Sequence, residues 1–237
     1  MIIGVIPARY QSTRLPGKPL QLIAGKPMIQ WVYEGSSQSK LIDEVWVATD
    51  DERILRAVQS FGGRAVMTSP DHQTGTDRLA EVAAGYPCDL VVNIQGDEPL
   101  IQGSVIDQVV RPLIDDPTIP MGTAMAVEDN LDSLQDPSVV KVVPDGNGFA
   151  LYFSRSMIPY PRKPGQSYRH IGLYVYRRDF LLKYHTLPAA PSELMESLEQ
   201  LRALHYGYRI KVTEVTGRFV GVDTPEDLEE VRKILGE

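Results

Sequence analysis

The start of the chain constrains the fold more than any other stretch. An apolar run from Ile2 to Ile6 ends at Pro7 and gives way to a polar, basic loop. An uninterrupted apolar run of this kind is typical of a parallel strand that is buried on both faces. Ligands of open α/β sheets bind at the edge where such strands end. We therefore expect this loop to lie at the binding edge of a sheet.

The loop carries three cationic side chains, Arg9, Arg14 and Lys18, together with small residues such as Ala8. Arginine offers phosphate oxygens a planar fork, and lysine offers them a point charge. Small residues let backbone N–H groups approach an anion closely. The pattern predicts a triphosphate site, and the alternative is a basic loop that is only solvated.

Composition limits the class of protein. The chain has 237 residues, of which 43% are hydrophobic and 23% charged, as in an ordinary globular domain. A net charge of −7 argues against broad electrostatic binding to nucleic acid or to an anionic membrane. Cys88 has no cysteine partner for an internal disulfide, and no Cys/His spacing indicates zinc. With neither a leader peptide nor a membrane-length apolar run, we expect a cytoplasmic protein.

The first half of the chain alternates predicted strands with predicted helices. Strands are expected at 2–6, 44–50, 65–68 and 89–94, and helices at 27–33, 52–61, 79–84 and 105–110. The residues before the second of these helices, Thr49, Asp50 and Asp51, would cap it, and Gly62 and Gly63 would end it. This alternation predicts a three-layer, Rossmann-like α/β fold with a mostly parallel sheet and right-handed crossovers.

The second half has a different pattern. It predicts a strand at 121–127, a hairpin at 139–154, an aromatic strand at 168–176, a helix at 192–206 and a strand at 210–215. A short strand would end at Asp223, with Thr224 capping a final helix that begins at Pro225. We expect residues 1–237 to form a single domain, in which an antiparallel insertion at about 130–175 makes a dimer interface.

Two carboxylates, Asp97 and Asp223, each follow a predicted strand. A carboxylate beside a triphosphate needs a counter-ion, because like charges repel. Mg²⁺ takes one or two carboxylates and completes its shell with water and phosphate oxygens. The sequence predicts a magnesium site on this pair. The alternative for Asp223 is a favourable position near a helix N-terminus.

Other polar residues are candidates for contacts with the rest of a ligand. Arg78 follows Gly75 at the start of a predicted helix, where it would reach a base or a sugar. The alternative is a surface arginine paired with Asp77 or Glu81. Gln95 lies beside Asp97 at a strand end and offers both donors and an acceptor.

A further cluster comes from the second half. His170 and Tyr174 lie on one face of the predicted aromatic strand, and Arg155 follows the predicted hairpin. Such an Arg–His–Tyr set would hold an anionic, hydroxyl-rich substrate. The alternative for His170 is a structural histidine.

Several motifs occur in an order that is specific for one family. They are IPARYQSTRLPGKP (6–19), VATD (47–50), DHQTGTDR (71–78), NIQGDEP (93–99), ALYFSR (150–155), RHIGLY (169–174), LEQLR (198–202) and GVDTPEDL (221–228). In these motifs the chain strongly resembles the 3-deoxy-manno-octulosonate (KDO) cytidylyltransferases, almost from end to end.

The resemblance implies a homodimeric nucleotidyltransferase that moves CMP from CTP to the anomeric hydroxyl of KDO, with release of pyrophosphate, for lipopolysaccharide biosynthesis. It implies one or two Mg²⁺ ions as cofactor, with Lys18, Arg14, Asp97 and Asp223 as the catalytic set. Nucleotide contacts would come from Ala8, Arg9, Arg14, Lys18, Gly75 and Arg78, metal ligands from Asp97 and Asp223, and sugar contacts from Gln95, Arg155, His170, Tyr174, Glu199 and Gln200. The alternatives are a related enzyme for amino-KDO or sialate, and a catalytically silent nucleotide-binding dimer.

Overall fold

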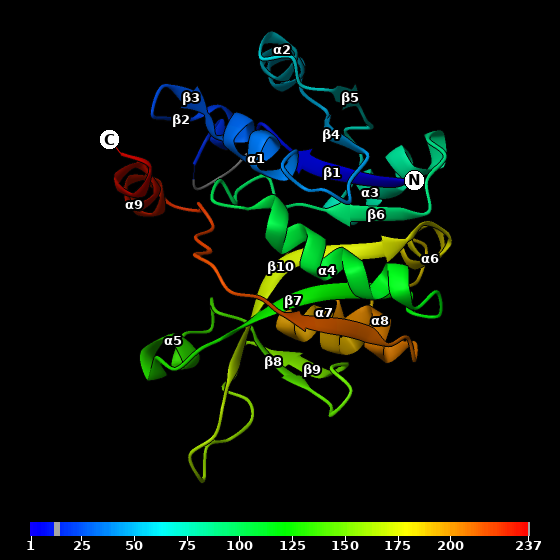
Figure 1. Cartoon of the computed structure of the whole chain (residues 1–237), viewed down its shortest axis with the longest axis vertical. Helices are drawn as coiled ribbons and strands as arrows, with labels where there is room; N and C mark the ends of the chain where they lie inside the picture. The colour runs from blue at the N-terminus through cyan, green and yellow to red at the C-terminus, as the bar shows by residue number, and fades with distance from the viewer. Residues whose placement is uncertain (12–14, 237) are drawn as a thin grey trace. The chain divides into compact units, whose positions relative to one another are not determined.

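The apolar N-terminal run forms strand β1 (Ile2–Ala8), which continues through Pro7 beyond the predicted end (Figure 1). Strand β1 lies between two parallel neighbours, β4 (Glu44–Thr49) and β6 (Leu90–Asn93), and β4 also pairs with β5 (Ala65–Met67). Buried apolar side chains on both faces of these strands explain the absence of polar alternation in the sequence. The predicted parallel sheet is confirmed here.

The computed structural model describes residues 1–11 and 15–236 and divides into two compact units. Unit 1 comprises Met1–Asp107 and Gly217–Glu237, and unit 2 comprises Gln108–Thr216. Among the described residues, no helix has the length and apolar character needed to cross a membrane.

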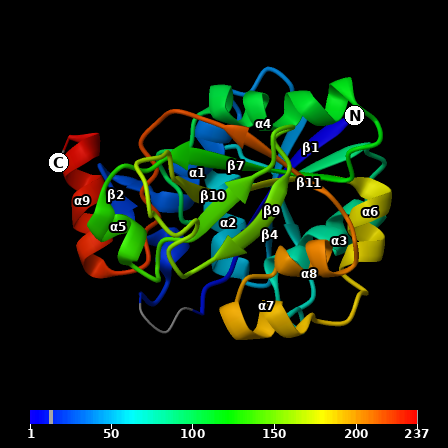
Figure 2. The ribbon, with the colours of Figure 1, turned by 90° about the horizontal axis from the view of Figure 1, so that it is seen from below.

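The helices of unit 1 begin where capping residues stand. Helix α2 (Glu52–Ser60) is capped by the Asp51 carboxylate, and Gly62 beyond its end has a φ of 81°. Helix α3 (Gly75–Gly85) begins earlier than predicted, because Thr74 and Asp77 form a capping box. Helices α1 and α3 lie on opposite faces of the strands (Figures 1 and 2).

Two further helices of unit 1 involve proline at or near their N-termini. Helix α1 (Met28–Ser36) has Pro27 at its N-cap rather than at its first position. Helix α9 (Pro225–Leu235) is capped by Thr224 with Asp227, and Pro225 is its first residue, as predicted. The strand predicted to end at Asp223 is wrong, because residues 217–223 form no strand. The remaining short elements are η1 (Lys18–Leu20), β2 (Leu22–Ile23) and β3 (Lys26–Pro27), and α4 (Gly103–Asp115) leads out of unit 1.

Unit 2 contains the antiparallel strands that the sequence predicts. Strand β7 (Met121–Val127) pairs in parallel with β11 (Ile210–Glu214) and antiparallel with β10 (Tyr168–Arg177). Strands β8 (Lys141–Pro144) and β9 (Ala150–Ser154) form the predicted hairpin, whose turn contains Gly148 at a φ of 72°. Strand β8 pairs in turn with β10.

The single helix predicted at 192–206 is wrong. The segment forms two helices, α7 (Pro191–Glu196) and α8 (Leu201–His205), which Figure 2 shows joined by a turn. Ser197 takes a left-handed conformation with a φ of 51°, which ends α7. Two short helices of this unit, α5 (Leu131–Gln135) and α6 (Arg178–Tyr184), were not predicted.

A buried ion pair joins α7 to α8. The Glu193 carboxylate accepts hydrogen bonds from both Nε and Nη2 of Arg202, and it also accepts one from the Ala190 backbone N–H. Glu193 is 7% exposed and Arg202 8%. Removing one partner of such a pair leaves the other charge buried without compensation.

We therefore expect Glu193→Ala to lower the free energy of unfolding by about 3–5 kcal/mol, measured by urea denaturation. The matched control is Glu52→Ala, which removes an exposed pair with Arg56 and should cost less than about 1 kcal/mol. Equal losses in the two variants would contradict this role of the buried pair.

Candidate active site

Lys18 lies between the two predicted metal ligands. Its Nζ donates to Asp97 Oδ2 at 2.7 Å and to Asp223 Oδ1 at 3.0 Å. These residues are far apart in sequence, and all belong to unit 1. The structure thus brings the two predicted carboxylates within reach of one cation.

The backbone of unit 1 explains how these three side chains meet. Gly17, with a φ of 63°, turns the chain immediately before Lys18, a conformation that favours glycine. The Val222 N–H donates to the Asp97 carbonyl at 2.9 Å. Val222 is fully buried in a core cluster with Leu15 and α9 residues. Packing of the C-terminal helix therefore sets the position of Asp223 beside Asp97.

Capping does not account for Asp223. Thr224 is the N-cap of α9, and the Asp227 carboxylate accepts from the backbone N–H groups of Asp223 and Thr224. The Asp223 carboxylate instead accepts from Lys18. The alternative for Asp223, a favourable position near a helix N-terminus, therefore does not explain the contact that its carboxylate makes with Lys18.

Electrostatics of the cluster favour the charged lysine. Burial would lower the pKa of Lys18, but the charges and hydrogen bonds of Asp97 and Asp223 outweigh it and raise that pKa. Lys18 therefore stays an ammonium at neutral pH. Two carboxylates that share one cation form an oxygen-rich, negatively charged donor set.

A cavity of about 370 Å³ opens beside this cluster. Its walls come from the end of β1, the start of η1, the loop after β6 and the segment before α9. The lining residues are Pro7, Ala8, Arg9, Gln11, Lys18, Pro19, Gln95, Gly96, Asp97 and Asp223. A Cβ on Gly96 would lie 2.9 Å from the Pro7 carbonyl oxygen, so the loop after β6 packs tightly against β1 here. The structure thus gathers most of the predicted residues of unit 1 around one space.

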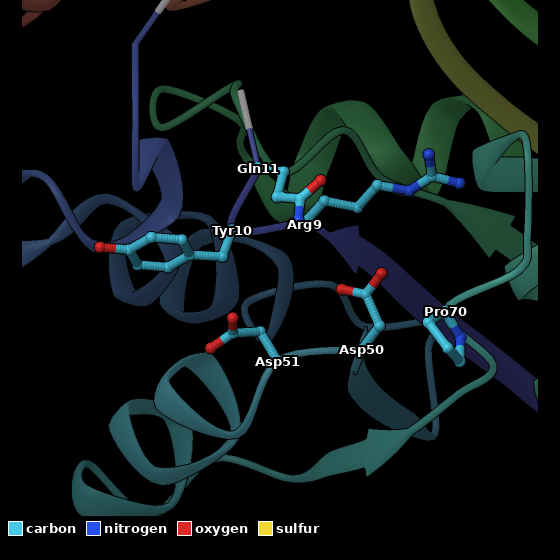
Figure 3. A pocket seen from close by; sticks show the side chains of 6 residues that line it. All are labelled: Arg9, Tyr10, Gln11, Asp50, Asp51 and Pro70. Carbon is cyan, nitrogen blue, oxygen red and sulfur yellow. The ribbon is translucent and has the colours of Figure 1, made fainter. Parts of the chain in front are cut away.

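A second cavity, of about 300 Å³, adjoins the same loop and is shown in Figure 3. Its walls include Tyr10, Asp50, Asp51 and Pro70, and the two carboxylates face the segment that carries Arg9 to Gln11 (Figure 3). Asp50 was not among the predicted site residues. Its place after a buried strand, in the motif VATD, is the signal that marks it.

The ring of Tyr10 fixes the basic loop against α2. The Arg53 guanidinium stacks over this ring, with Cζ 3.3 Å from its centroid, and pairs with Asp51. The Gly17 N–H donates to the Tyr10 carbonyl at 3.1 Å. These contacts connect the N-cap of α2 to the turn that delivers Lys18.

The other cations of the predicted nucleotide site differ in their surroundings. Arg9 lines both cavities, and its Nη2 donates to the backbone carbonyls of His72 and Thr74. Arg78 is fully buried and donates to Thr68 Oγ1 and to Asp50, at 3.0 Å for the latter. The alternative of a surface arginine paired with Asp77 or Glu81 is therefore wrong.

Two predicted nucleotide residues remain. Gly75 is the first residue of α3, where a Cβ would lie 3.4 Å from the Pro7 ring. Arg14 lies outside the residues that the structure describes.

In unit 2 the predicted aromatic pair comes together. The rings of His170 and Tyr174 have centroids 5.4 Å apart, and Phe153 packs edge-on against His170 at 5.0 Å. A β-bulge lies between Ile171 and Tyr174 in the pairing with β7. The shared face that the sequence predicts is therefore confirmed, although the strand is not regular between the two residues.

Burial sets the protonation states of this pair. Burial lowers the pKa of His170 to about 3, so its imidazole is neutral at pH 7. Burial and the nearby Glu199 raise the pKa of Tyr174, so its phenol stays protonated. The pair presents neutral hydrogen-bonding groups.

The other predicted sugar contacts of unit 2 surround the turn between α7 and α8. Arg155 donates to the backbone carbonyls of Pro137, Glu196 and Ser197, so its guanidinium fastens this turn. Gln200 is 4% exposed, and its Nε2 has no hydrogen-bond partner among the described residues. The backbone carbonyl of Glu199 accepts from the Tyr184 hydroxyl at 2.6 Å.

The lowered pKa of His170 predicts a pH dependence of stability. Between pH 6.5 and about 3, the unfolded chain binds a proton at this residue that the folded chain does not. Stability from this source is complete above pH 6.5 and is lost as the pH falls. Urea denaturation at pH 7.5 and 5.0 should show a larger loss for the wild type than for His170→Asn. Equal losses would contradict a buried neutral imidazole.

Comparisons with known proteins show which family the chain resembles. A family model described as "Cytidylyltransferase" matches residues 3–211. The 3-deoxy-manno-octulosonate cytidylyltransferase of Syntrophotalea carbinolica is 56% identical, covering 99% of this chain and 98% of its own length. The protein of the same description from Geobacter sulfurreducens is 51% identical, covering 99% of each chain.

A solved structure extends the agreement to the fold. It is described as CMP:2-keto-3-deoxy-manno-octonic acid synthetase complexed with CTP, and it is 48% identical to this chain. It superposes with a TM-score of 0.95 over 99% of this chain and 98% of its own. The expected α/β nucleotidyltransferase fold is thereby confirmed, and the chain belongs to the 3-deoxy-manno-octulosonate cytidylyltransferase family of enzymes.

Proposed function

We propose that the protein transfers CMP from CTP to the anomeric hydroxyl of KDO and releases pyrophosphate. The observation that carries this proposal is the cavity that holds Arg9 and Lys18 together with the carboxylates of Asp97 and Asp223. Cations for a polyphosphate and paired carboxylates for a metal are the parts that nucleotidyl transfer needs. The names of the relatives identify the substrates of those proteins as CTP and KDO.

The reaction brings together two anions, a triphosphate and a sugar carboxylate. Positioning and charge neutralisation supply most of the acceleration in such transfers. Lys18 and Arg9 place positive charge on the cavity wall, where they would bind the phosphates and stabilise the leaving pyrophosphate. Ala8 and Gly96, also on that wall, have no long side chain that would keep a nucleotide away from the backbone.

Asp97 and Asp223 would hold Mg²⁺. The fit is supported by the ammonium of Lys18, a cation that already lies within hydrogen-bond distance of both carboxylates. Mg²⁺ prefers oxygen ligands and takes few from the protein when a polyphosphate supplies others. When bound, the ion would neutralise phosphate charge and lower the pKa of a coordinated hydroxyl.

In unit 2, His170, Tyr174, Glu199 and Gln200 would contact the sugar acid. The buried Nε2 of Gln200, which lacks a partner among the described residues, supports this assignment because an unpaired buried donor is costly without a ligand. Arg155 would act on this set through the turn that it fastens. A nucleoside triphosphate substrate supports the expected cytoplasmic location.

Pyrophosphate release tests the function directly. Purified protein would be mixed with CTP, Mg²⁺ and KDO, with amino-KDO, N-acetylneuraminate or UTP in parallel reactions and EDTA in another. Release with CTP and KDO that EDTA abolishes is expected. Release only with amino-KDO or sialate would identify that sugar, rather than KDO, as the substrate. No release from any pair, with CTP still raising the melting temperature, would favour a silent nucleotide-binding protein.

Asp97→Asn should reduce kcat/KM by at least about a hundredfold, because the carboxylate charge supports several kcal/mol of transition-state stabilisation. Asp179→Asn is the matched control, since the Asp179 carboxylate is 98% exposed on α6. It should change kcat/KM by only a small factor. Near-normal turnover in Asp97→Asn would remove this carboxylate from the mechanism.

We also propose that the protein is a homodimer that pairs through β9 and α7. Leu151 on β9 is 61% exposed, and Leu194 and Met195 on α7 are 68% and 87% exposed. Hydrogen bonds from Ser154 and Arg155 to Glu196 hold the end of β9 beside α7, so these side chains share one region of unit 2. Apolar side chains gathered on a surface mark an interaction site.

Met195→Glu should therefore convert the dimer to a monomer, as seen by sedimentation velocity, because it places a charge in an apolar interface. Leu131→Glu is the control, since Leu131 is 61% exposed on α5, away from this surface. A wild-type monomer, or a dimer that persists in Met195→Glu, would contradict this interface.

A further inference from the structure

The buried hydroxyl of Thr123 lies beside the His170 imidazole. Thr123 Oγ1 is 2.9 Å from His170 Nε2 and 2.8 Å from the Leu173 carbonyl oxygen. The Ile171 carbonyl oxygen is a more distant neighbour, at 3.4 Å. Thr123 is fully buried on β7, so no water replaces these contacts.

Counting protons determines the direction of each hydrogen bond. A hydroxyl has a single proton to donate, and a carbonyl oxygen can only accept. An oxygen–oxygen distance of 2.8 Å without a proton between the atoms would be repulsive, so the Thr123 proton points to Leu173. Toward His170 the hydroxyl therefore offers a lone pair, and Nε2 must carry the proton.

The β-bulge in β10 makes this arrangement possible. The register with β7 shifts between Ile171 and Tyr174, which opposes Thr123. Bulges interrupt the ladder and re-aim side chains. The Leu173 carbonyl within the bulge is then bound by a side chain, and His170 turns its Nε2 toward the same hydroxyl.

We propose that Thr123 is a positioning residue that fixes His170 as the Nε2–H tautomer, so that Nδ1 is presented as an acceptor for a substrate hydroxyl. The inference deepens the proposed function and rests on it for the nature of the substrate. Among the described residues, none hydrogen-bonds to Nδ1. Because a bare ring nitrogen accepts and does not donate, it selects a hydroxyl donor.

Two features keep the imidazole in this state. Phe153, fully buried, packs edge-on against the ring and restrains its rotation. Burial disfavours the imidazolium form, so Nδ1 remains unprotonated over the neutral pH range. With Nε2 committed to Thr123, Nδ1 is the one ring nitrogen left to meet a ligand.

The test compares Thr123→Val, which removes the hydroxyl at nearly constant shape, with Thr123→Ser, which keeps it. The tautomer is read from the ring ¹⁵N resonances of histidine-labelled, ligand-free protein at pH 7.5, with His170→Asn assigning the signal among the 4 histidines. The wild type and Thr123→Ser should show the Nε2–H tautomer, and Thr123→Val should show a mixture. KM for KDO should rise about tenfold in Thr123→Val, as for one lost hydrogen bond, with KM for CTP unchanged.

An Nδ1–H tautomer in the wild type would overturn the inference, as would a Thr123→Val protein with unaltered tautomer and unaltered KM for KDO. The resonance measurement uses free protein, so it still decides what Thr123 does if the wild type fails to use KDO. That failure would count against the proposed function alone. A general loss of folding in Thr123→Val would appear in the melting temperature, and Thr123→Ala, which also removes the hydroxyl, then takes its place in the same comparison.

Discussion

The site of unit 1 depends on one ion-pair cluster, in which Lys18 lies between Asp97 and Asp223. Without a cation between them, two carboxylates brought this close would repel each other, and the repulsion would destabilise the folded protein. The ammonium removes that cost in the ligand-free protein, and its hydrogen bonds hold both side chains toward the cavity. We propose that the same carboxylates would hold a divalent ion when a nucleotide brings its phosphates to the cavity.

The position of Lys18 depends in turn on contacts outside the cavity. The Asp51 carboxylate caps α2 and holds Arg53, whose guanidinium stacks on Tyr10. Tyr10 then contacts the Gly17 turn that precedes Lys18. On the opposite side, burial of Val222 fixes the segment that carries Asp223. Substitutions at these supporting residues should change the site without touching a ligand.

The fold of unit 1 and most residues of its site could be predicted from the sequence. The parallel strands are nearly continuous apolar runs, and the helices of this unit have recognisable caps. The division of residues 192–206 into two helices could not be predicted, because it follows from Ser197 in a left-handed conformation and from a buried Glu193–Arg202 pair. Burial of Arg78 against Asp50 could not be predicted either, because the spacing of charges along a helix does not reveal partners on other elements. The role of Thr123 could not be predicted from the sequence either, because its contact with His170 depends on the β-bulge in β10.

The central claim is that Asp97 and Asp223 together form a divalent-cation site beside the nucleotide loop. Calorimetric titration of Mg²⁺ into protein saturated with a non-reactive CTP analogue tests this claim, using the wild type, Asp97→Asn, Asp223→Asn and the exposed control Asp179→Asn. Ion binding should be present in the wild type and Asp179→Asn and strongly weakened in each of the other two. Equal Mg²⁺ affinity in all four proteins would contradict the account.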